Sequence, residues 1–137
     1  MTSARHYKTK ATEKSEYTIF LQKANEFFRT MYQAEKAENW NAVGLTGVHT
    51  VISLIDALLV KHCGIRSSDE SHMTVVDLLT SSVGNKLKDV AQKSQTARRI
   101  IAKKNIVAYE NRNFIKSEAI DLIKKVDRFY RWAINQL

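Results

Sequence analysis

The sequence predicts an all-α protein: an up-and-down bundle of four long helices and one short helix, the third in chain order. Three observations lead to this class. Proline is absent from the 137 residues and only four glycines occur, so helix breakers are scarce. Apolar residues recur at intervals of three and four along successive segments. No segment alternates apolar and polar residues with a period of two, so no sheet is expected.

The first two predicted helices are long. The first covers roughly residues 12–37. Its apolar face consists of Tyr17, Phe20, Leu21, Ala24, Phe27, Phe28 and Met31. The second helix runs from an N-cap near Asn39 to His62 or Cys63, and Gly64 follows as a stop.

Glycines and capping residues add detail within and after the second helix. Gly44 and Gly47 lie inside it, where each costs about 1 kcal/mol relative to Ala. We therefore expect the backbone of a neighbouring helix to approach closely there. Ser67 and Glu70 have the spacing of a capping box, which predicts the start of the short third helix. That helix should end near Gly84.

The fourth predicted helix begins at an N-cap, Asn85, and ends before an Asn- and Arg-rich corner at 111–113. Its inner stripe is Leu87, Val90, Ala91, Ser94, Ala97 and Ile101, and the period continues to Lys104, Asn105 and Ala108. The apolar face of the last helix is Ala119, Leu122, Ile123, Val126, Phe129, Tyr130 and Ala133.

Length and composition favour one globular domain over residues 1–137, with 1–11 as a mobile basic arm. The single cysteine, Cys63, excludes an internal disulfide framework and fits a reducing cytoplasm, where we expect the protein to be. No apolar run approaches the length of a membrane span, and no apolar stretch follows the basic start as in a secretory signal. We therefore expect no membrane partner.

The net charge of +8 is unevenly distributed. Residues 1–85 hold nine Lys and Arg against nine Asp and Glu, which cancel. Residues 86–137 hold thirteen against five, which is the whole excess. Such asymmetry favours a phosphate-bearing partner, most simply nucleic acid, over a merely solubilising basic surface.

A polar group interrupts the inner stripe of the fourth helix. Lys104 and Asn105 occupy positions where the stripe requires Leu or Ala, and Tyr109 follows four residues after Asn105, on the same face. The candidate binding residues are Arg98, Arg99, Lys103, Lys104, Asn105, Tyr109 and Arg112. Such cationic and hydrogen-bonding groups suit phosphate or ribose. The alternative is a solvated helix end whose cations interact favourably with the helix dipole.

Other chemistry has weaker signals. His49 and Ser53 could form a base–nucleophile pair, although a histidine that bonds to a neighbouring helix is the commoner arrangement. His62, Cys63 and His72 do not have a zinc spacing and lack a fourth ligand, so no metal is expected. The glycines match no phosphate-binding loop, and we expect no cofactor.

The order of elements resembles the HEPN family, the helical "higher eukaryotes and prokaryotes nucleotide-binding" domains, from roughly residue 12 to the end. The segments that carry the resemblance are GLTGVHTVISLIDALLVKHCGI, SHMTVVDLL and SEAIDLIKKVDRFYRWAI. Between the last two, the family has an Arg-Asn-x-x-x-His motif at the end of a helix. Here Lys104, Asn105 and Tyr109 take those positions and Glu110 follows, as in a branch of the family that carries Tyr and an acidic residue.

The resemblance implies a homodimer whose motif faces the symmetry mate. In ribonuclease members of the family, the Arg and His act on the scissile phosphate. Lys104 keeps the charge but not the bidentate fork of Arg, and a tyrosine hydroxyl, with an ordinary pKa of about 10, is a poor base near neutral pH. We therefore expect binding of RNA or a nucleotide without efficient catalysis. Two alternatives are an interaction partner of a nucleotidyltransferase, in a toxin–antitoxin-like or defence system, and an active metal-independent ribonuclease.

Overall fold

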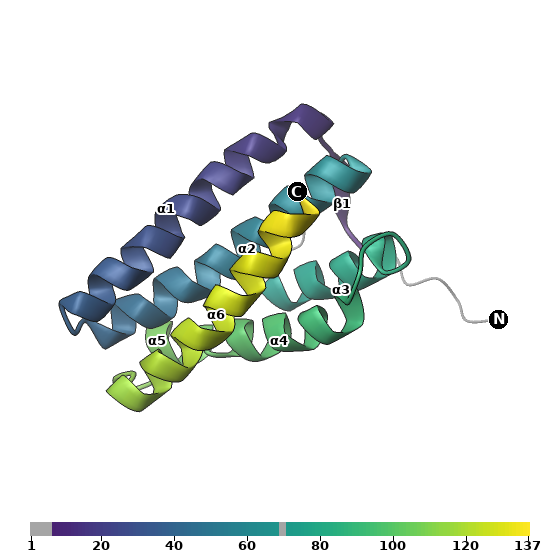
Figure 1. The fold of residues 1–137 in the computed structure, drawn as a ribbon. Coiled ribbons are helices and arrows are strands. Elements are labelled where there is room, and N and C mark those ends of the chain that lie inside the picture. Colours follow the sequence, from purple (N-terminus) through teal and green to yellow (C-terminus); the bar gives the residue numbers. More distant parts are fainter. Residues whose placement is uncertain (1–6, 69–70) are drawn as a thin grey trace.

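The computed structural model describes residues 7–68 and 71–137, and these residues are mostly helical, as predicted (Figure 1). The elements are β1 (Thr9–Ala11), a short 3-10 helix η1 (Lys14–Glu16), α1 (Tyr17–Lys36), α2 (Trp40–Cys63), β2 (Ile65–Ser67), α3 (His72–Val83), α4 (Val90–Ala102), α5 (Lys104–Ala108) and α6 (Lys116–Gln136). Only α1, α2 and α6 are long; the predicted fourth long helix is divided into α4 and α5.

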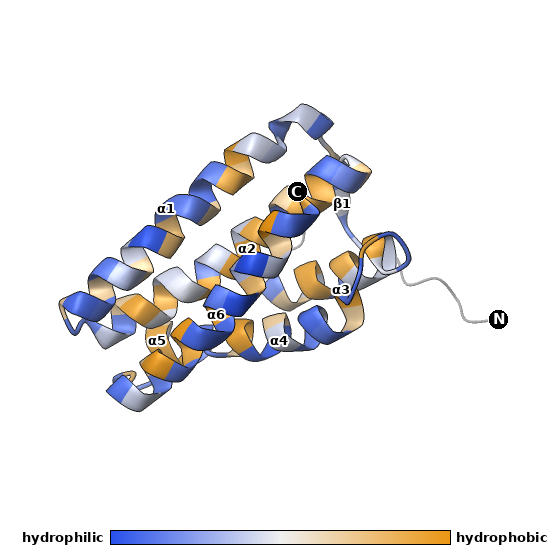
Figure 2. Ribbon diagram, in the orientation of Figure 1, coloured by the Kyte–Doolittle hydropathy of each residue, from blue (hydrophilic) through white to orange (hydrophobic). Residues whose placement is uncertain are grey.

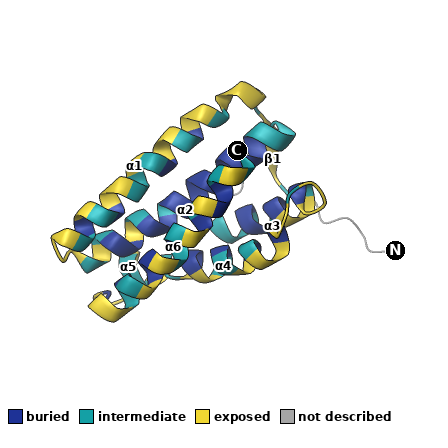
Figure 3. Ribbon diagram, in the orientation of Figure 1, coloured by how far each residue is buried: buried dark blue, intermediate teal, exposed yellow. Residues whose placement is uncertain are grey.

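The central element is α2, which packs against α1, α3, α4, α5 and α6. In Figure 3 it is the most continuously buried helix, and in Figure 2 the apolar sides of the surrounding helices face it. It ends as predicted at Gly64, whose φ of 65° is left-handed and whose N–H bonds to the Val60 carbonyl at 2.9 Å.

The expectation about apolar runs needs correction, because α2 is long and apolar enough to cross a membrane. It alone passes that test among the residues that the structure describes. However, 78% of its most apolar window is buried inside the fold. The core helix of a small bundle has the same composition, since it is covered on all sides.

A small sheet corrects the expectation of none. β1 and β2 pair antiparallel, with Lys10 opposite Arg66 and Ala11 opposite Ile65. Each strand has three residues, too few to show an alternation in the sequence. The predicted mobile arm is therefore wrong for Thr9–Ala11, and residues 1–6 lie outside the described part of the chain.

Two predicted helix starts are also wrong. Ser67 belongs to β2, Glu70 lies outside the described residues, and α3 begins at His72 with Ser71 as its N-cap residue. The end of α3 before Gly84 is as predicted. The next helix begins only at Val90, because the chain after α3 makes further turns: the Lys86 and Leu87 N–H groups both donate to the Val83 carbonyl at 3.0 Å.

The division at Lys103 changes which side chains face inward. Its N–H donates to the Ile100 carbonyl and its own carbonyl accepts from Ile106, both at 3.1 Å, so the chain makes tighter three-residue turns here. Ile106 and Val107 consequently pack against the core, whereas Asn105 and Ala108 are exposed. The expectation that Asn105 and Ala108 point inward was therefore wrong, and Lys104 is half-buried.

Close approach at the two α2 glycines comes from side chains and not from a neighbouring backbone. A Cβ at Gly44 would lie 2.4 Å from Val107 Cγ1 of α5. One at Gly47 would lie 3.2 Å from Met31 Sδ, with Leu122 and Val126 nearly as close. Gly44 thus allows α5 to lie against α2.

The chain after α5 is fixed by Phe114, which is only 2% exposed and belongs to the core. Its N–H donates to Asn41 Oδ1 of α2 at 2.7 Å, and Asn41 also donates to Asn113 Oδ1 at 3.0 Å. At the other end of the bundle, the indole N–H of Trp132 donates to the Lys88 carbonyl at 2.9 Å, which ties α6 to the segment before α4. These contacts set the positions of α5 and α4.

Candidate functional site

The three residues at the motif positions, Lys104, Asn105 and Tyr109, line one hollow of about 210 Å³, which we call the motif hollow. Its other lining residues are Ser71, His72 and Met73 at the start of α3 and Ile101 and Ala102 at the end of α4. The hollow therefore lies where α3, α4 and α5 meet, although the helix that carries the three residues is not continuous.

Tyr109 directly follows α5 and is 75% exposed, an unusual state for a large aromatic side chain. Its backbone N–H and that of Glu110 both donate to the Asn105 carbonyl, at 3.0 and 2.9 Å. This turn fixes the backbone and leaves the ring at the surface. Its face is available to stack on a flat ligand.

Two histidines lie near Lys104, and the sequence did not predict this arrangement. The ring centroids of His49 and His72 are 6.0 Å apart with the planes at 82°, and the other neighbour of His49 is Phe27 at 5.7 Å. Burial lowers the pKa of both imidazoles, and the positive charge of Lys104 lowers both further. His49, His72 and Lys104 come from α2, α3 and α5, so no spacing in the sequence indicates this cluster.

The other sequence hypotheses for His49 and the metal site have no geometric support. Ser53 is 7% exposed, and within the described residues no hydrogen bond joins it to His49. His62 Nε2 lies 2.8 Å from the Gln136 carbonyl, and the Cys63 thiol faces the Ser82 carbonyl at 3.7 Å, so both side chains have backbone partners. The described chain contains no group of three His, Cys, Asp or Glu side chains that could hold a metal ion.

Arg98 and Arg112 have carboxylate partners. Arg98 donates to Asp77 of α3. Arg112 forms a two-pronged pair with Glu118, with N···O distances of 2.9 and 2.8 Å, and this pair lowers the pKa of Glu118 to about 2. Lys103 also lowers the pKa of Glu118 and so lies on the same side. Arg98, Lys103 and Arg112 are not among the residues that line the motif hollow.

Arg99, the neighbour of Arg98, lies on another side of α4. It lines a cleft of about 190 Å³ between α4 and α6, which we call the α4/α6 cleft. The lining residues are Gln92, Lys93, Thr96 and Arg99 from α4 and Lys125 and Arg128 from α6. Of these, the sequence interpretation named only Arg99.

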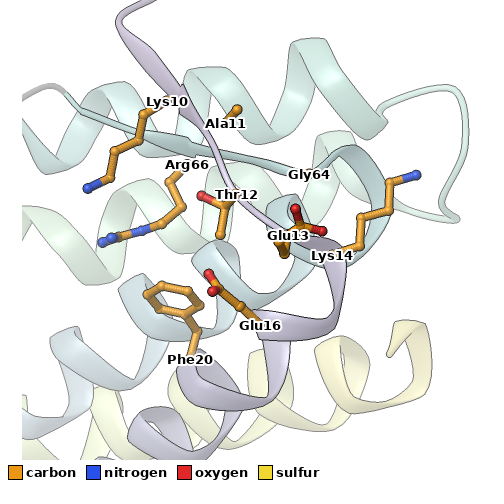
Figure 4. A pocket seen from close by; sticks show the side chains of 9 residues that line it. All are labelled: Lys10, Ala11, Thr12, Glu13, Lys14, Glu16, Phe20, Gly64 and Arg66. Atoms are coloured by element: carbon orange, nitrogen blue, oxygen red, sulfur yellow. The ribbon is translucent and has the colours of Figure 1, made fainter.

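A larger pocket of about 570 Å³ lies near the small sheet (Figure 4). Arg66 lies over the Phe20 ring at 4.5 Å, and its buried Nε has no hydrogen-bond partner among the described residues. Lys10 lies on the same side as Arg66 in the figure, and Glu16 faces the same space. Because Glu13 and Lys14 also line it, this pocket has mixed charge, in contrast to the α4/α6 cleft.

Comparisons of this chain with protein-family models, with curated proteins and with solved structures found no match. The side chains and their geometry are therefore what supports a function.

Proposed function

We propose that this chain is a HEPN-like helical domain that binds RNA or a nucleotide at the motif hollow, without efficient catalysis. The observation that carries the proposal is the combination of a cation, an amide and an exposed aromatic ring around one hollow. The Lys104 ammonium would attract a phosphate, the Asn105 amide can donate and accept hydrogen bonds, and the Tyr109 ring can stack on a base.

Weak catalysis is expected from the same three side chains. A lysine binds phosphate as a point charge and lacks the planar fork with which arginine grips two oxygens. A phenol is also a poor proton acceptor near neutral pH. Both features leave binding intact while they remove the groups on which cleavage in the resembled family depends.

Binding of a labelled single-stranded RNA, measured by fluorescence anisotropy across a salt series, tests the proposal. Tyr109→Ala should weaken affinity by about 1–3 kcal/mol, because a base loses its stacking surface. Lys104→Gln should reduce the log–log salt slope by about 0.7, because one phosphate contact is lost. Ile19→Ala, at a 50% exposed position of α1, serves as the matched control. Affinity and slope unchanged in both variants would refute the proposal.

A second candidate, RNA cleavage, is favoured by the two histidines beside Lys104. One imidazole would take the proton of the ribose 2′-hydroxyl as its oxygen attacks phosphorus, and the other, protonated, would give a proton to the departing 5′-oxygen. The lowered pKa of both rings makes the protonated acid scarce near neutral pH. Robust cleavage that is lost in His49→Asn or His72→Asn would favour this candidate over binding alone.

The Tyr109→His and Lys104→Arg double variant is the complementary experiment. It restores the titrating base and the bidentate grip of the resembled motif, and we expect it to gain some cleavage of single-stranded RNA. If it binds RNA but stays inactive, the motif hollow is a binding site and nothing more.

We also propose a homodimer, as the resemblance implies. Among the described residues, three of the four exposed large apolar side chains, Leu45, Tyr109 and Ile115, belong to α2 or to the segment that follows α5. A two-fold interface is self-complementary, so a surface that carries these side chains could meet its own copy. Light scattering at micromolar concentration should give the mass of a dimer; the mass of a monomer would contradict this part of the proposal.

A further inference from the structure

The α4/α6 cleft differs from the motif hollow in how it is built. α4 and α6 pack against each other, and both bury an apolar face, with Ala97 and Ile101 from α4 and Val126 and Phe129 from α6. Gln92, Thr96 and Arg99 repeat at four- and three-residue intervals and so share one flank of α4, and Lys125 and Arg128 share a flank of α6. The lining groups are therefore held by two packed helices.

Most of the positive charge in the cleft has no carboxylate partner among the described residues. Four of the six lining residues are Lys or Arg and none is acidic. Lys125 pairs with Asp121 at 2.9 Å. Lys93, Arg99 and Arg128 make no ion pair with any described residue, whereas Arg98, Arg112 and Arg131 each bond to a carboxylate.

Like charges gathered around one cleft repel each other, and a concave surface with low-dielectric walls concentrates their electric field. An anion that enters the cleft removes the repulsion and gains the attraction of several cations together. The neutral groups fit the same role, since Gln92 has an amide that can donate and Thr96 has a hydroxyl. The Thr96 hydroxyl bonds only weakly to the Gln92 carbonyl, at 3.4 Å in an exposed position, so it can turn toward a ligand.

We propose that the α4/α6 cleft is a second phosphate-binding site, separate from the motif hollow. The guanidinium groups of Arg99 and Arg128 would each grip phosphate oxygens in a fork, and the Lys93 ammonium would add a point charge. The ligand class is a phosphate group, from either the backbone of RNA or a free or terminal diphosphate. The site goes beyond the proposed function, because it uses no residue of the motif hollow.

Calorimetric titration at low salt tests the cleft directly. The probes are inorganic pyrophosphate and a short single-stranded RNA that lacks a terminal phosphate. The Arg99→Gln and Arg128→Gln double variant changes two exposed side chains and should keep the fold, which its thermal unfolding checks. The control, Arg29→Gln with Lys36→Gln, removes two positive charges from exposed positions on α1. It keeps the cleft intact.

We expect the cleft variant to bind at least one probe roughly 10-fold or more weakly than the control, because charge-assisted hydrogen bonds are lost. Loss for pyrophosphate alone identifies a free or terminal phosphate as the ligand, and loss for RNA alone identifies the backbone. Equal affinity of the cleft variant and the control for both probes overturns the proposal. Lys93→Gln with Lys125→Gln repeats the test if the first variant is destabilised. The motif hollow is unchanged in all these proteins. Whether the hollow binds RNA is tested separately, by the effect of Tyr109→Ala and Lys104→Gln on RNA affinity.

Discussion

The two sides of α4 use positive charge differently. On the α3 side, Arg98 bonds to Asp77, and Lys104 lies beside two histidines whose pKa it lowers. On the α6 side, Arg99 and Arg128 have no carboxylate partner among the described residues. Adjacent arginines in the sequence thus have different roles, one in packing α3 on α4 and one in an open cleft. The net charge of +8 therefore does not imply that the basic residues form a single binding face.

The two sides also differ in how their helices are anchored to the core. The motif hollow depends on α5, a helix of five residues with none fully buried, which contacts the core through Ile106, Val107 and the following Phe114. The α4/α6 cleft is formed by helices of 13 and 21 residues with buried faces. Changes in the packing of α5 should therefore alter the hollow and leave the cleft intact.

The largest expected effect on stability comes from removing Phe114, the buried side chain that anchors the segment after α5. Phe114→Ala should destabilise the protein by about 3–5 kcal/mol, since it deletes a buried ring from the core. Urea denaturation measures this. The adjacent Ile115→Ala, at a 53% exposed position, should change stability by at most about 0.5 kcal/mol. A similar cost for both variants would show that Phe114 does not anchor the segment.

Gly44→Ala should have a smaller effect on stability and a selective one on binding. Its new Cβ would overlap Val107, which costs about 1–3 kcal/mol and is partly offset by about 1 kcal/mol of helix propensity. α5 should move, so RNA affinity at the hollow falls while pyrophosphate affinity at the cleft stays the same. Gly47→Ala is the control, because its Cβ meets α1 and α6 side chains and not α5. Equal binding losses in both glycine variants would contradict the separation of the two sites.

The two adjacent arginines provide the next comparison. Arg98→Gln should cost no more than about 1 kcal/mol of stability, because the pair with Asp77 is partly exposed, and it should leave phosphate binding unchanged. Arg99→Gln should do the reverse, with little change in the thermal midpoint and weaker pyrophosphate binding. If the two variants behave alike in both measurements, the assignment of different roles is wrong.

The smallest expected effect is electrostatic. Lys104→Gln should raise the pKa of His49 and His72, because the charge that lowers them is gone. In the folded state both imidazole pKa values lie below the ordinary value for histidine. The protein therefore loses stability as the pH falls below the pKa of unfolded histidine, and the variant should lose less stability over that range. Proton NMR titration of the imidazole signals measures the shifts. Lys93→Gln, in the cleft, should leave both values unchanged.

Local signals in the sequence predicted part of the fold. The end of α2 at Gly64 follows from one residue with a left-handed φ, and the burial of α1, α2 and α6 follows from their apolar spacing. Possible capping residues are common, so Ser67 and Asn85 were misleading. No glycine or proline marks the break at Lys103, and the only signal in the sequence is the interruption of the apolar stripe by Lys104 and Asn105. The close contact of Val107 with α2 at Gly44 is tertiary and could not be predicted from the spacing.

The site was predicted less well than the fold. Lys104, Asn105 and Tyr109 were expected to share a helix face, and they line one hollow at a broken helix instead. His49 and His72 come near Lys104 only through the tertiary packing of α2, α3 and α5, so the spacing of these residues in the sequence does not predict it. The separation of Arg98 from Arg99 did have a signal, since Ala97 and Ile101 face the core and the two arginines fall on either flank of that stripe.

The salt dependence of RNA binding tests the central claim, that two separate phosphate-binding regions flank α4. The proteins to compare are the unmodified chain, Lys104→Gln, Arg99→Gln with Arg128→Gln, and the combination of all three changes. We predict that the log–log slope falls by about 0.7 for the hollow, by about 1.4 for the cleft, and by the sum of the two for the combination. A slope that is the same in all four proteins, at an unchanged fold, would contradict the account.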